Sequence, residues 1–421
     1  MTKASAANGQ INHICFITPE YLNLQTMLPL DGGLANYLCK ISTALVMRGY
    51  NVSVICTEGA EDRVLDYKGV NVYFLKGKYQ KTFLEKIKNL FSSKKKKQKI
   101  KSEILYYKIH KQIQEIHRQK KIDIIQYASY LAMGKYPEKN IPSCVRISSY
   151  AKLWQKYYNY ENTQEIENEI IQFKNACFMY GPSKYIADYI KRDLALKADI
   201  QIIETPFVPY QGEENKELYV SLNNQIGKNP YLLFFGSLGL LKGAQEIADI
   251  IYEILDRYQN LYLVLVGKEM PIDGKSPVNM IKDNAKQYCD RVVYFNKTTH
   301  DKLFPLIKGS KAVLLPSRVD NLPNTCIEAM GLKKIVIGSQ GASFEQLIDD
   351  EKSGLLCQAG NAESILIAVE KLMSLSDEQI KNMEQKAYER SLRLSPDVIV
   401  PQVLDYYQHV IQNWGQNEIL N

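Results

Sequence analysis

The sequence lacks the features of a secreted, membrane-spanning or zinc-binding protein. No apolar run approaches the ~18 residues that cross a bilayer. The first residues, Met1 to Gln10, are polar, which predicts no secretory signal. The eight cysteines include no Cys-x-x-Cys pair, and Cys15, Cys56 and Cys326 lie inside apolar runs. We therefore expect reduced core cysteines in a cytoplasmic protein, without a disulfide framework or a zinc site.

Excess positive charge is absent from most of the chain and concentrated in one segment. Lys76 to Lys101 contain eleven lysines and a single acid, Glu85, which is a local net charge of +10. Because the 421 residues carry +7 in total, the remainder of the chain carries −3. A nucleic-acid-binding fold usually spreads its basic residues more widely, so we expect no nucleic-acid partner.

The same segment has an apolar stripe in front of its lysine cluster. Its apolar side chains recur at the spacing of one helical face: Phe83, Leu84, Ile87, Leu90 and Phe91. An amphipathic stripe beside clustered lysines is typical of a helix on an anionic membrane, where each lysine contributes roughly 1 kcal/mol. The alternative is a solvated loop that packs its apolar face on the domain. Phe83 to Lys101 therefore predict either peripheral contact with the inner face of a membrane or a surface loop.

Strand-like and helical patterns alternate along the whole chain, with one interruption. The first series of strands runs from Ile11–Thr18 to Ile200–Ile203, and the second from Tyr231–Phe235 to Ile335–Ile337. Between them, the Pro-rich run Thr205–Pro209 and a polar stretch to Asn229 predict a connection between domains. The alternation indicates an α/β fold with two Rossmann-like, doubly wound domains of parallel strands. We expect the domains to face each other across a cleft that holds the ligand site.

Two glycine motifs precede predicted helices. Gly32 and Gly33 open the first helix. Glycines there let the backbone approach a ligand closely, and the free N–H groups at the helix N-terminus favour an anion. Lys242-Gly243 follow a strand that ends in Gly236, which would present an ammonium group and backbone N–H groups to a diphosphate. Each motif also has a structural explanation, because glycines commonly serve turns and lysines are commonly exposed.

The run from Pro316 to Met330 contains the strongest chemical pattern. Asp320 follows a predicted strand, and Glu328 lies about two turns inside the next helix, after Pro323. Carboxylates at these positions accept hydrogen bonds from hydroxyl groups at two distant points of an extended ligand. The amides near Asn324 and Thr325 form a helix N-terminus suited to a phosphate. Helix capping is the alternative for the polar residues of the loop, but it does not explain Glu328 within Cys-Ile-Glu-Ala-Met.

With these motifs, the chain resembles the retaining GT-B glycosyltransferases of family four, also called group 1 glycosyltransferases. That family has a Glu-x7-Glu motif, where this chain has Asp320 and Glu328, and a phosphate-binding Lys-Gly, where it has Lys242-Gly243. The resemblance implies a GT-B fold with three segments. These are an N-terminal acceptor-binding domain (1–205), a C-terminal nucleotide-sugar-binding domain (206–395), and a last helix (396–421) that packs back on the N-terminal domain.

The resemblance also implies a role for each matching residue. Lys242 would hold the donor diphosphate and Asp320 would contact the transferred sugar, so these two are the candidate catalytic residues. Glu328 would bind the ribose. The complete set of implied donor-binding residues is Gly32, Gly33, Ser237, Arg318, Asn321, Leu322, Asn324, Thr325 and Glu328.

The chain departs from the family pattern at three positions. Ser237 stands where the family usually has a phosphate-binding Arg, with Arg318 as a candidate substitute, and Asp320 replaces Glu. Ser148 stands where the family has a His that contacts the sugar, which makes Arg146, Ser148 and Ser149 the candidate acceptor or sugar ligands.

The resemblance implies a retaining hexosyltransferase that uses a nucleotide-diphosphate donor, with a UDP-sugar as the expected one. The acceptor would be a glycan or a lipid-linked glycan in cell-surface polysaccharide synthesis. The sequence contains no Asp-x-Asp, and neither a metal nor another cofactor is expected. The alternative is a non-catalytic GT-B subunit that binds nucleotide-sugar or glycan and supports a partner transferase.

Overall fold

The computed structural model describes residues 11–30, 32–59, 61–76, 94–157 and 163–415, and of residues 58 and 94–102 only the backbone. The described residues divide into two compact units. Unit 1 holds the residues up to Pro182, Ile186–Pro206 and the residues from Pro396 onward, and unit 2 holds Ser183–Tyr185 and Phe207–Ser395. The sequence analysis places the corresponding boundaries after residues 205 and 395.

Unit 1 is built on an eight-stranded sheet with the order β3-β4-β2-β1-β5-β6-β7-β8. Its inner strands pair in parallel and are buried, as their continuous apolar runs predict. The strands are β1 (His13–Thr18), β2 (Asn51–Gly59), β3 (Arg63–Tyr67), β4 (Val70–Lys76), β5 (Ile124–Ala128), β6 (Ser143–Arg146), β7 (Met179–Gly181) and β8 (Ile200–Ile202).

One edge of this sheet differs from the expected parallel arrangement. Strand β3 pairs antiparallel with β4 through a tight hairpin at Lys68 and Gly69, whose φ angles are 53° and 84°. The Gly69 amide donates to the Asp66 carboxylate at 3.1 Å, which closes the turn. Because β3 is largely exposed, it lacks the apolar run by which the buried strands are predicted.

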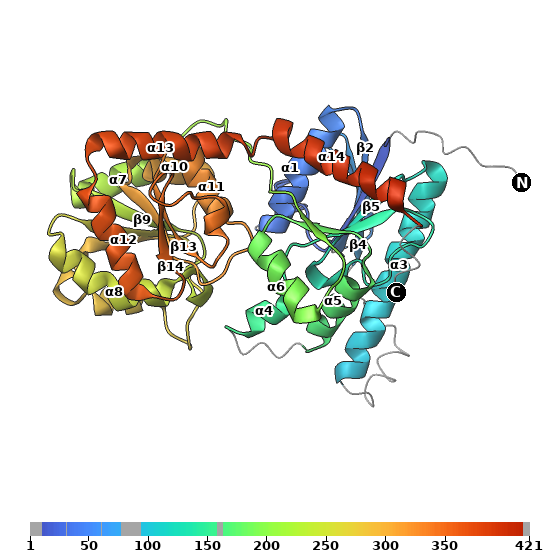
Figure 1. Ribbon diagram of the computed structural model, residues 1–421, viewed down its shortest axis with the longest axis horizontal. Helices are drawn as coiled ribbons and strands as arrows, with labels where there is room; N and C mark the ends of the chain where they lie inside the picture. Colours follow the sequence, from blue (N-terminus) through green and yellow to red (C-terminus); the bar gives the residue numbers. More distant parts are fainter. Residues whose placement is uncertain (1–10, 31, 60, 77–93, 158–162, 416–421) are drawn as a thin grey trace, which may run out of the picture. The chain divides into compact units, whose positions relative to one another are not determined.

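Helices cover this sheet, and the last helix of the chain belongs to the same unit. They are α1 (Gly33–Met47), α3 (Lys94–Gln119), α4 (Ala151–Gln155), α5 (Thr163–Asn175), α6 (Lys184–Leu194) and α14 (Pro396–Asn413), with the short turn η2 (Tyr130–Ala132). Helix α14 lies beside α1 (Figure 1), and the Tyr407 hydroxyl at its centre donates to Gln126 Oε1 of β5 at 2.6 Å. The apolar stripe predicted at Phe83 to Phe91 lies outside the described residues, and α3 begins at Lys94.

Unit 2 has a fully parallel six-stranded sheet with the order β11-β10-β9-β12-β13-β14. Its strands are β9 (Tyr231–Phe235), β10 (Tyr262–Val266), β11 (Val292–Phe295), β12 (Ala312–Leu315), β13 (Val336–Gln340) and β14 (Leu355–Gln358). Its helices are α7 (Glu217–Ile226), α8 (Ala244–Arg257), α9 (Pro277–Asn284), α10 (His300–Gly309), α11 (Asn324–Gly331), α12 (Ala362–Ser374) and α13 (Asp377–Leu392), with the 3₁₀ turns η3 (Leu240–Lys242), η4 (Lys286–Arg291) and η5 (Phe344–Gln346).

The polar stretch after Pro209 corrects one expectation. The sequence analysis assigns residues up to Asn229 to an interdomain connection, but they lie within unit 2, and α7 occupies half of this stretch and packs against α10. The buried side chains of α7 are Leu222 and Ile226. Two apolar residues one helical turn apart suffice to dock this ten-residue helix, and they leave its overall composition polar.

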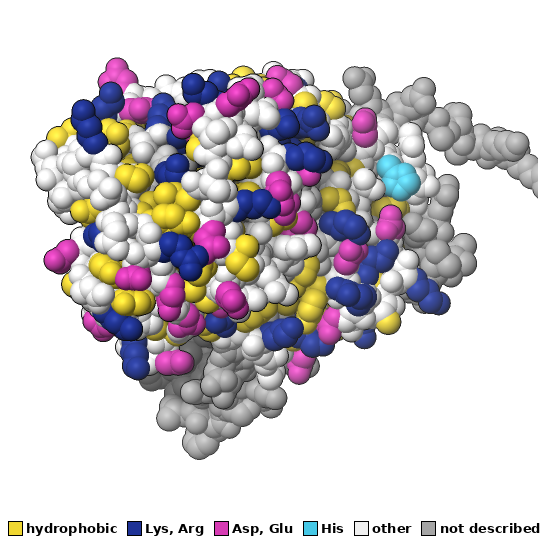
Figure 2. All heavy atoms as spheres, turned by 60° about the vertical axis from the view of Figure 1, so that its left-hand side comes forward, with side chains coloured by type: hydrophobic (Ala, Val, Ile, Leu, Met, Phe, Trp, Pro, Cys, Tyr) yellow, Lys and Arg dark blue, Asp and Glu magenta, His cyan; other side chains and the backbone are white. Residues whose placement is uncertain are grey.

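The surface carries charges of both signs. On the face drawn in Figure 2, basic and acidic side chains are interspersed, without a patch of one sign.

Among the described residues, no helix is both long and apolar enough to cross a membrane.

Candidate active site

The candidate site of unit 2 lies where the order of its strands reverses. Strand β9 is the first strand of this sheet along the chain, and it pairs with β10 on one side and with β12 on the other. The loops after β9 and β12 therefore lie at the carboxyl ends of the strands where their order reverses, which is where ligands of such sheets bind. Ser237, Lys242, Arg318, Asp320 and the start of α11 all come from these two loops.

Two glycines allow these loops to pack closely. Gly243 has a φ angle of 82°, and a Cβ atom on it would overlap the carbonyl oxygen of Pro316 in the loop after β12. Gly267, after β10, has a φ angle of 151°, and its Cβ would overlap the carbonyl oxygen of Gly236. Each position combines a positive φ with contact to a neighbouring backbone, so glycine is required there.

Lys242 and Asp320, the two candidate catalytic residues, form an ion pair. The Lys242 ammonium group contacts Asp320 Oδ2, with 35% of the Lys242 side chain and 14% of the Asp320 side chain exposed. The loop holds Asp320 in place, because the Asn321 amide donates to its Oδ1 at 3.0 Å and the Ser343 hydroxyl donates to its carbonyl oxygen at 2.8 Å. The predicted cation and carboxylate are therefore adjacent and reachable from solvent.

The buried carboxylate of Glu246 holds Arg318, which lies in the loop after β12. Its amide donates to the carbonyl oxygen of Leu241 at 2.9 Å, which ties the β12 loop to η3. Its guanidinium Nε donates to Glu246 Oε1 of α8 at 2.6 Å. Since the Glu246 side chain is only 4% exposed, its charge requires this counter-ion, so part of the Arg318 charge is already neutralised within the fold.

Helix α11 brings its N-terminus to the end of β9. Its amides at Cys326 and Ile327 donate to the Pro323 carbonyl, whereas Asn324 and Thr325 supply the first two N–H groups, which have no acceptor within the helix. Thr325 lies close to Gly236, since a Cβ atom on that glycine would sit 3.8 Å from Thr325 Cγ2. The helix N-terminus thus faces the loop that precedes Lys242.

The buried face of α11 anchors the helix and leaves Glu328 beside solvent. The anchoring side chains are Cys326, Ile327, Ala329 and Met330, and burial raises the pKa of the Cys326 thiol. Leu322, in the preceding loop, is also buried, so it shapes the loop through packing. The Glu328 side chain is 18% exposed, and its Oε1 lies 3.5 Å from Nε2 of His300 at the start of α10.

Sequence reasoning missed His300. No sequence motif links position 300 to position 328, and only the fold brings the start of α10 beside Glu328 of α11. His13, by contrast, is a packed histidine: its Nε2 lies 2.9 Å from Ser53 Oγ, and burial lowers its pKa.

The candidate residues of unit 1 form a group of their own at the carboxyl end of β6. Arg146 is only 3% exposed, and its guanidinium lies over the Tyr37 ring, 3.4 Å from the centroid. Ser148 and Ser149 are held through Ser129, whose hydroxyl accepts from both of their amides at 2.9 and 3.3 Å. The structure therefore places Arg146 as a buried side chain, and the two serines in a hydrogen-bonded loop.

The predicted anion site at the start of α1 already has a carboxylate beside it. Gly32 and Gly33 are exposed, and the Ala35 amide in the first turn of α1 donates to Glu20 Oε1 at 3.3 Å. Glu20 thus takes the position at this helix N-terminus that a phosphate would otherwise favour.

Comparison with known proteins relates this architecture to enzymes that act on sugars. Residues 217–390 match the family model for glycosyl transferases group 1. Alpha-D-kanosaminyltransferase of Streptomyces kanamyceticus is 23% identical over 34% of this chain and 36% of its own length. The matches to curated relatives cover between 36% and 58% of those proteins.

Solved structures resemble the chain over almost its full length. Sucrose-phosphate synthase of Thermosynechococcus elongatus has a TM-score of 0.73 at 16% identity and covers 95% of this chain and 99% of its own. The Anabaena protein HepE in complex with UDP and glucose has a TM-score of 0.63 at 15% identity, with coverages of 94% and 98%. The shared arrangement is the GT-B fold, as the sequence predicts. Residues 217–390 thus match the group 1 glycosyltransferase family, within a chain that has the GT-B fold.

Proposed function

We propose that the chain transfers a hexose-type sugar, with retention of anomeric configuration, from a nucleotide-diphosphate donor to a glycan or lipid-linked acceptor in polysaccharide synthesis. A UDP-sugar is the proposed donor, since the similar Anabaena structure holds UDP and glucose. The observation that carries the proposal is the Lys242–Asp320 pair at the strand-order reversal of unit 2, beside the N-terminus of α11.

The pair suits a ligand that carries both phosphate and hydroxyl groups. An incoming diphosphate would take the Lys242 ammonium as its counter-ion, and the freed Asp320 carboxylate would accept hydrogen bonds from sugar hydroxyls. The amides of Asn324 and Thr325 would donate to the distal phosphate. Because Arg318 is committed to Glu246, Lys242 would be the main cation of the site.

The proposed reaction depends on stabilising the leaving group. The bond between the anomeric carbon and the diphosphate oxygen breaks, and a bond to the acceptor oxygen forms on the same face of the sugar. The acceptor proton passes to the departing diphosphate, whose negative charge Lys242 and the α11 N-terminus would stabilise. No metal ion is required in this scheme, because these groups supply the positive charge.

Glu328 is proposed to bind the ribose of the nucleotide. Its carboxylate is partly exposed near the first turn of α11, and two oxygens suit two neighbouring hydroxyl groups. His300, whose Nε2 lies 3.5 Å from Oε1, would hold this carboxylate in place.

Thermal-shift measurements with UDP-, GDP- and ADP-sugars test the donor site. We expect one nucleotide class to raise the apparent stability, by ~2.7 kcal/mol at a hundredfold excess over the dissociation constant. Glu328→Ala should abolish the shift, whereas Glu253→Ala, an exposed acid on α8, should preserve it. NMR of the product made from the stabilising donor then reports the anomeric configuration. Absence of a shift with every donor would contradict the proposal and favour the non-catalytic subunit.

We also propose that Phe83 to Lys101 hold the protein on an anionic membrane surface while it acts on its acceptor. The positive net charge of this segment supports the proposal, because most of that charge comes from the lysines that follow the apolar stripe. Deletion of residues 94–101 should release the protein from phosphatidylserine vesicles and leave nucleotide binding intact. Equal vesicle binding by the deletion variant would refute this role.

A further inference from the structure

A row of aromatic rings crosses unit 1 where α14 packs on the end of the sheet. Tyr180 of β7 lies 5.1 Å from Tyr406 of α14 between ring centroids, and Tyr406 stacks on His409 at 6.4 Å. His409 in turn lies 6.0 Å from Phe178, and Phe178 stacks on Trp414 at 6.2 Å. The row is therefore continuous over five rings.

Three rings of this row border a groove of about 1050 Å³, which we call the α14 groove. Phe178, Tyr406 and His409 line it together with the end of α5, the loop before β8, β8 itself and one face of α14. Its charged lining consists of two lysines and two acids, and its amides come from two glutamines: Lys174, Lys197, Asp199, Asp405, Gln201 and Gln402.

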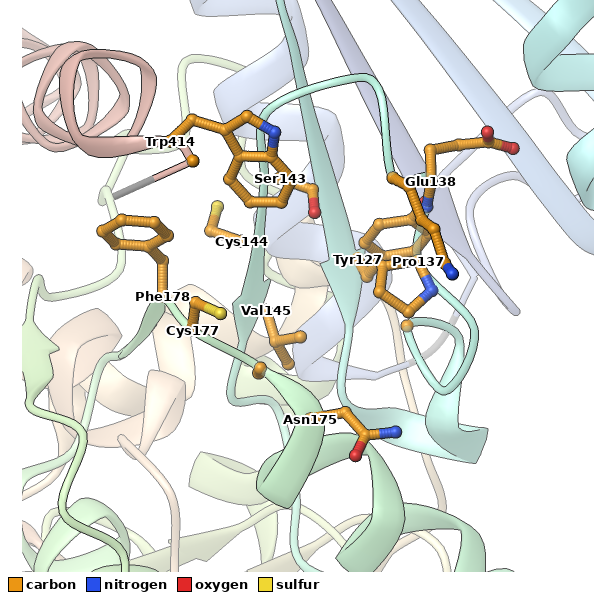
Figure 3. A pocket seen from close by; sticks show the side chains of 14 residues that line it. Tyr127, Pro137, Glu138, Ser143, Cys144, Val145, Asn175, Cys177, Phe178 and Trp414 are labelled. Atoms are coloured by element: carbon orange, nitrogen blue, oxygen red, sulfur yellow. The ribbon is translucent and has the colours of Figure 1, made fainter. Parts of the chain in front are cut away.

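A smaller cavity of about 140 Å³ adjoins this groove (Figure 3). The two share Ala176, Cys177 and Phe178, so Phe178 lines both. Figure 3 shows Trp414 and Phe178 on one side of the cavity and Tyr127 on the other. The aromatic surface thus continues from the groove into this smaller cavity.

Within unit 1, the α14 groove lies at the opposite end of the strands from the loop that holds Ser148 and Ser149. Phe178 and Asp199 immediately precede β7 and β8, so they mark the amino ends of these strands. Ser148 follows the carboxyl end of β6, which runs parallel to β7. A ligand in the groove therefore occupies a site separate from that loop.

The exposure of α14 side chains shows that the row does more than hold the helix. Tyr407, on the buried face, is fully enclosed and bonds to Gln126, so it fixes the helix to the sheet. Tyr406 is half-buried and His409 is exposed, and both border open space. Packing alone does not require aromatic rings at these two positions.

We propose that the α14 groove binds a neutral oligosaccharide segment. Pyranose rings present apolar C–H faces that pack on aromatic rings, while their hydroxyl groups exchange hydrogen bonds with carboxylates, amides and ammonium groups. The balanced charge of the lining suits an uncharged ligand, since phosphate-bearing polymers and anionic headgroups require a net positive surface. The groove would hold the distant part of a growing glycan while its end is extended elsewhere.

Trp414 provides a direct signal for binding. The chain has only two tryptophans, so a Trp154→Phe variant reports Trp414 fluorescence alone. We would titrate this full-length variant with neutral hexasaccharides of glucose, mannose, galactose and N-acetylglucosamine, and with a heparin hexasaccharide. At least one neutral hexasaccharide should change the emission saturably, and the corresponding disaccharide should bind at least tenfold more weakly because it spans fewer rings.

Matched variants separate the groove from general effects on folding. His409→Ala, at an exposed position, and Tyr406→Ala should each weaken binding at least tenfold, whereas Tyr406→Phe, which keeps the ring, should retain it. Tyr107→Ala, at an exposed tyrosine of α3, should have no effect. Donor-induced thermal shifts should be unchanged in all of these variants, so failure of this proposal is distinguishable from failure of the proposed function.

Three outcomes would overturn the proposal. These are no saturable response to any neutral hexasaccharide, equal affinities in His409→Ala and the parent, and tighter binding of the heparin hexasaccharide than of every neutral one.

Discussion

The two units share strand-helix alternation but differ in the polar groups at the carboxyl ends of their strands. In unit 2 the pairs Lys242–Asp320 and Glu328–His300 are partly exposed. In unit 1 the corresponding region holds Arg146, which is buried over Tyr37. A charge that remains accessible is available to a ligand, whereas a charge enclosed by the fold mainly organises its surroundings.

The same contrast extends to the buried networks. Gln126 Oε1 of unit 1 accepts from the hydroxyls of Tyr180 and Tyr407, and Tyr180 and Tyr37 share a hydrogen bond of 2.8 Å. Burial raises the pKa of all three tyrosines, so they stay neutral donors and acceptors. Unit 1 therefore uses buried polar side chains to attach α14, whereas unit 2 leaves the pairs Lys242–Asp320 and Glu328–His300 partly exposed. The following experiments test this division.

The largest effect is expected from Lys242→Ala. The proposed reaction loses its main cation at the departing diphosphate, so kcat/KM should fall about 10²- to 10³-fold. The assay measures nucleotide release from the donor that stabilises the protein. Lys268→Ala, at an exposed lysine just after β10, is the control and should leave the rate unchanged. Equal rates for the two variants would show that the accessible charge of unit 2 is not used as proposed.

Gly243→Ala tests whether the site depends on the close approach of two loops. Gly243 and Gly274 have φ angles of 82° and 78°, but a Cβ would overlap Pro316 only at Gly243, and at Gly274 it would meet nothing within 4 Å. We expect Gly274→Ala to cost about 1 kcal/mol, from the backbone alone. Gly243→Ala should cost about 3 kcal/mol or more in urea unfolding. Equal costs would mean that the loops are free to separate.

Sequence patterns predicted the fold and named candidate residues in the loops of unit 2, but they did not predict how those residues pair. Buried parallel strands and loops at their ends produce local signals, such as apolar runs and Lys242-Gly243. Contacts between Lys242 and Asp320, or between Glu328 and His300, join residues 78 and 28 positions apart and depend on how the strands pair. Exposed β3 and polar α7 were missed for the related reason that few of their residues face the core.

Glu169 gives unit 1 a pH dependence that unit 2 should not share. This carboxyl group is fully buried, its Oε2 accepts from the Ala151 amide at 2.6 Å, and burial raises its pKa to about 8. Because its folded pKa exceeds the unfolded value of 4.5, the folded state binds the extra proton and loses stability as pH rises from about 4.5 to 8. Between pH 5 and 8 the loss should be about 3 kcal/mol.

Glu169→Gln removes this titration and keeps an acceptor for Ala151. Urea unfolding at pH 5 and pH 8 should show a smaller pH-dependent loss than in the parent protein. Glu167→Gln, an exposed change on the same helix α5, should behave like the parent. If all three proteins lose the same stability over this range, Glu169 is already ionised in the folded state.

The smallest expected effect comes from Tyr407→Phe, which tests how α14 is attached. The substitution keeps the ring in the core and removes one hydrogen bond, while Tyr180 continues to donate to Gln126 Oε1. Because the acceptor stays satisfied, the cost should be about 1 kcal/mol, measured as a shift of the urea midpoint. Gln126→Leu removes the shared acceptor from both tyrosines and should cost more. A larger loss in Tyr407→Phe than in Gln126→Leu would mean that the two tyrosine hydroxyls do not act through this glutamine, and that the attachment of α14 depends on another contact of Tyr407.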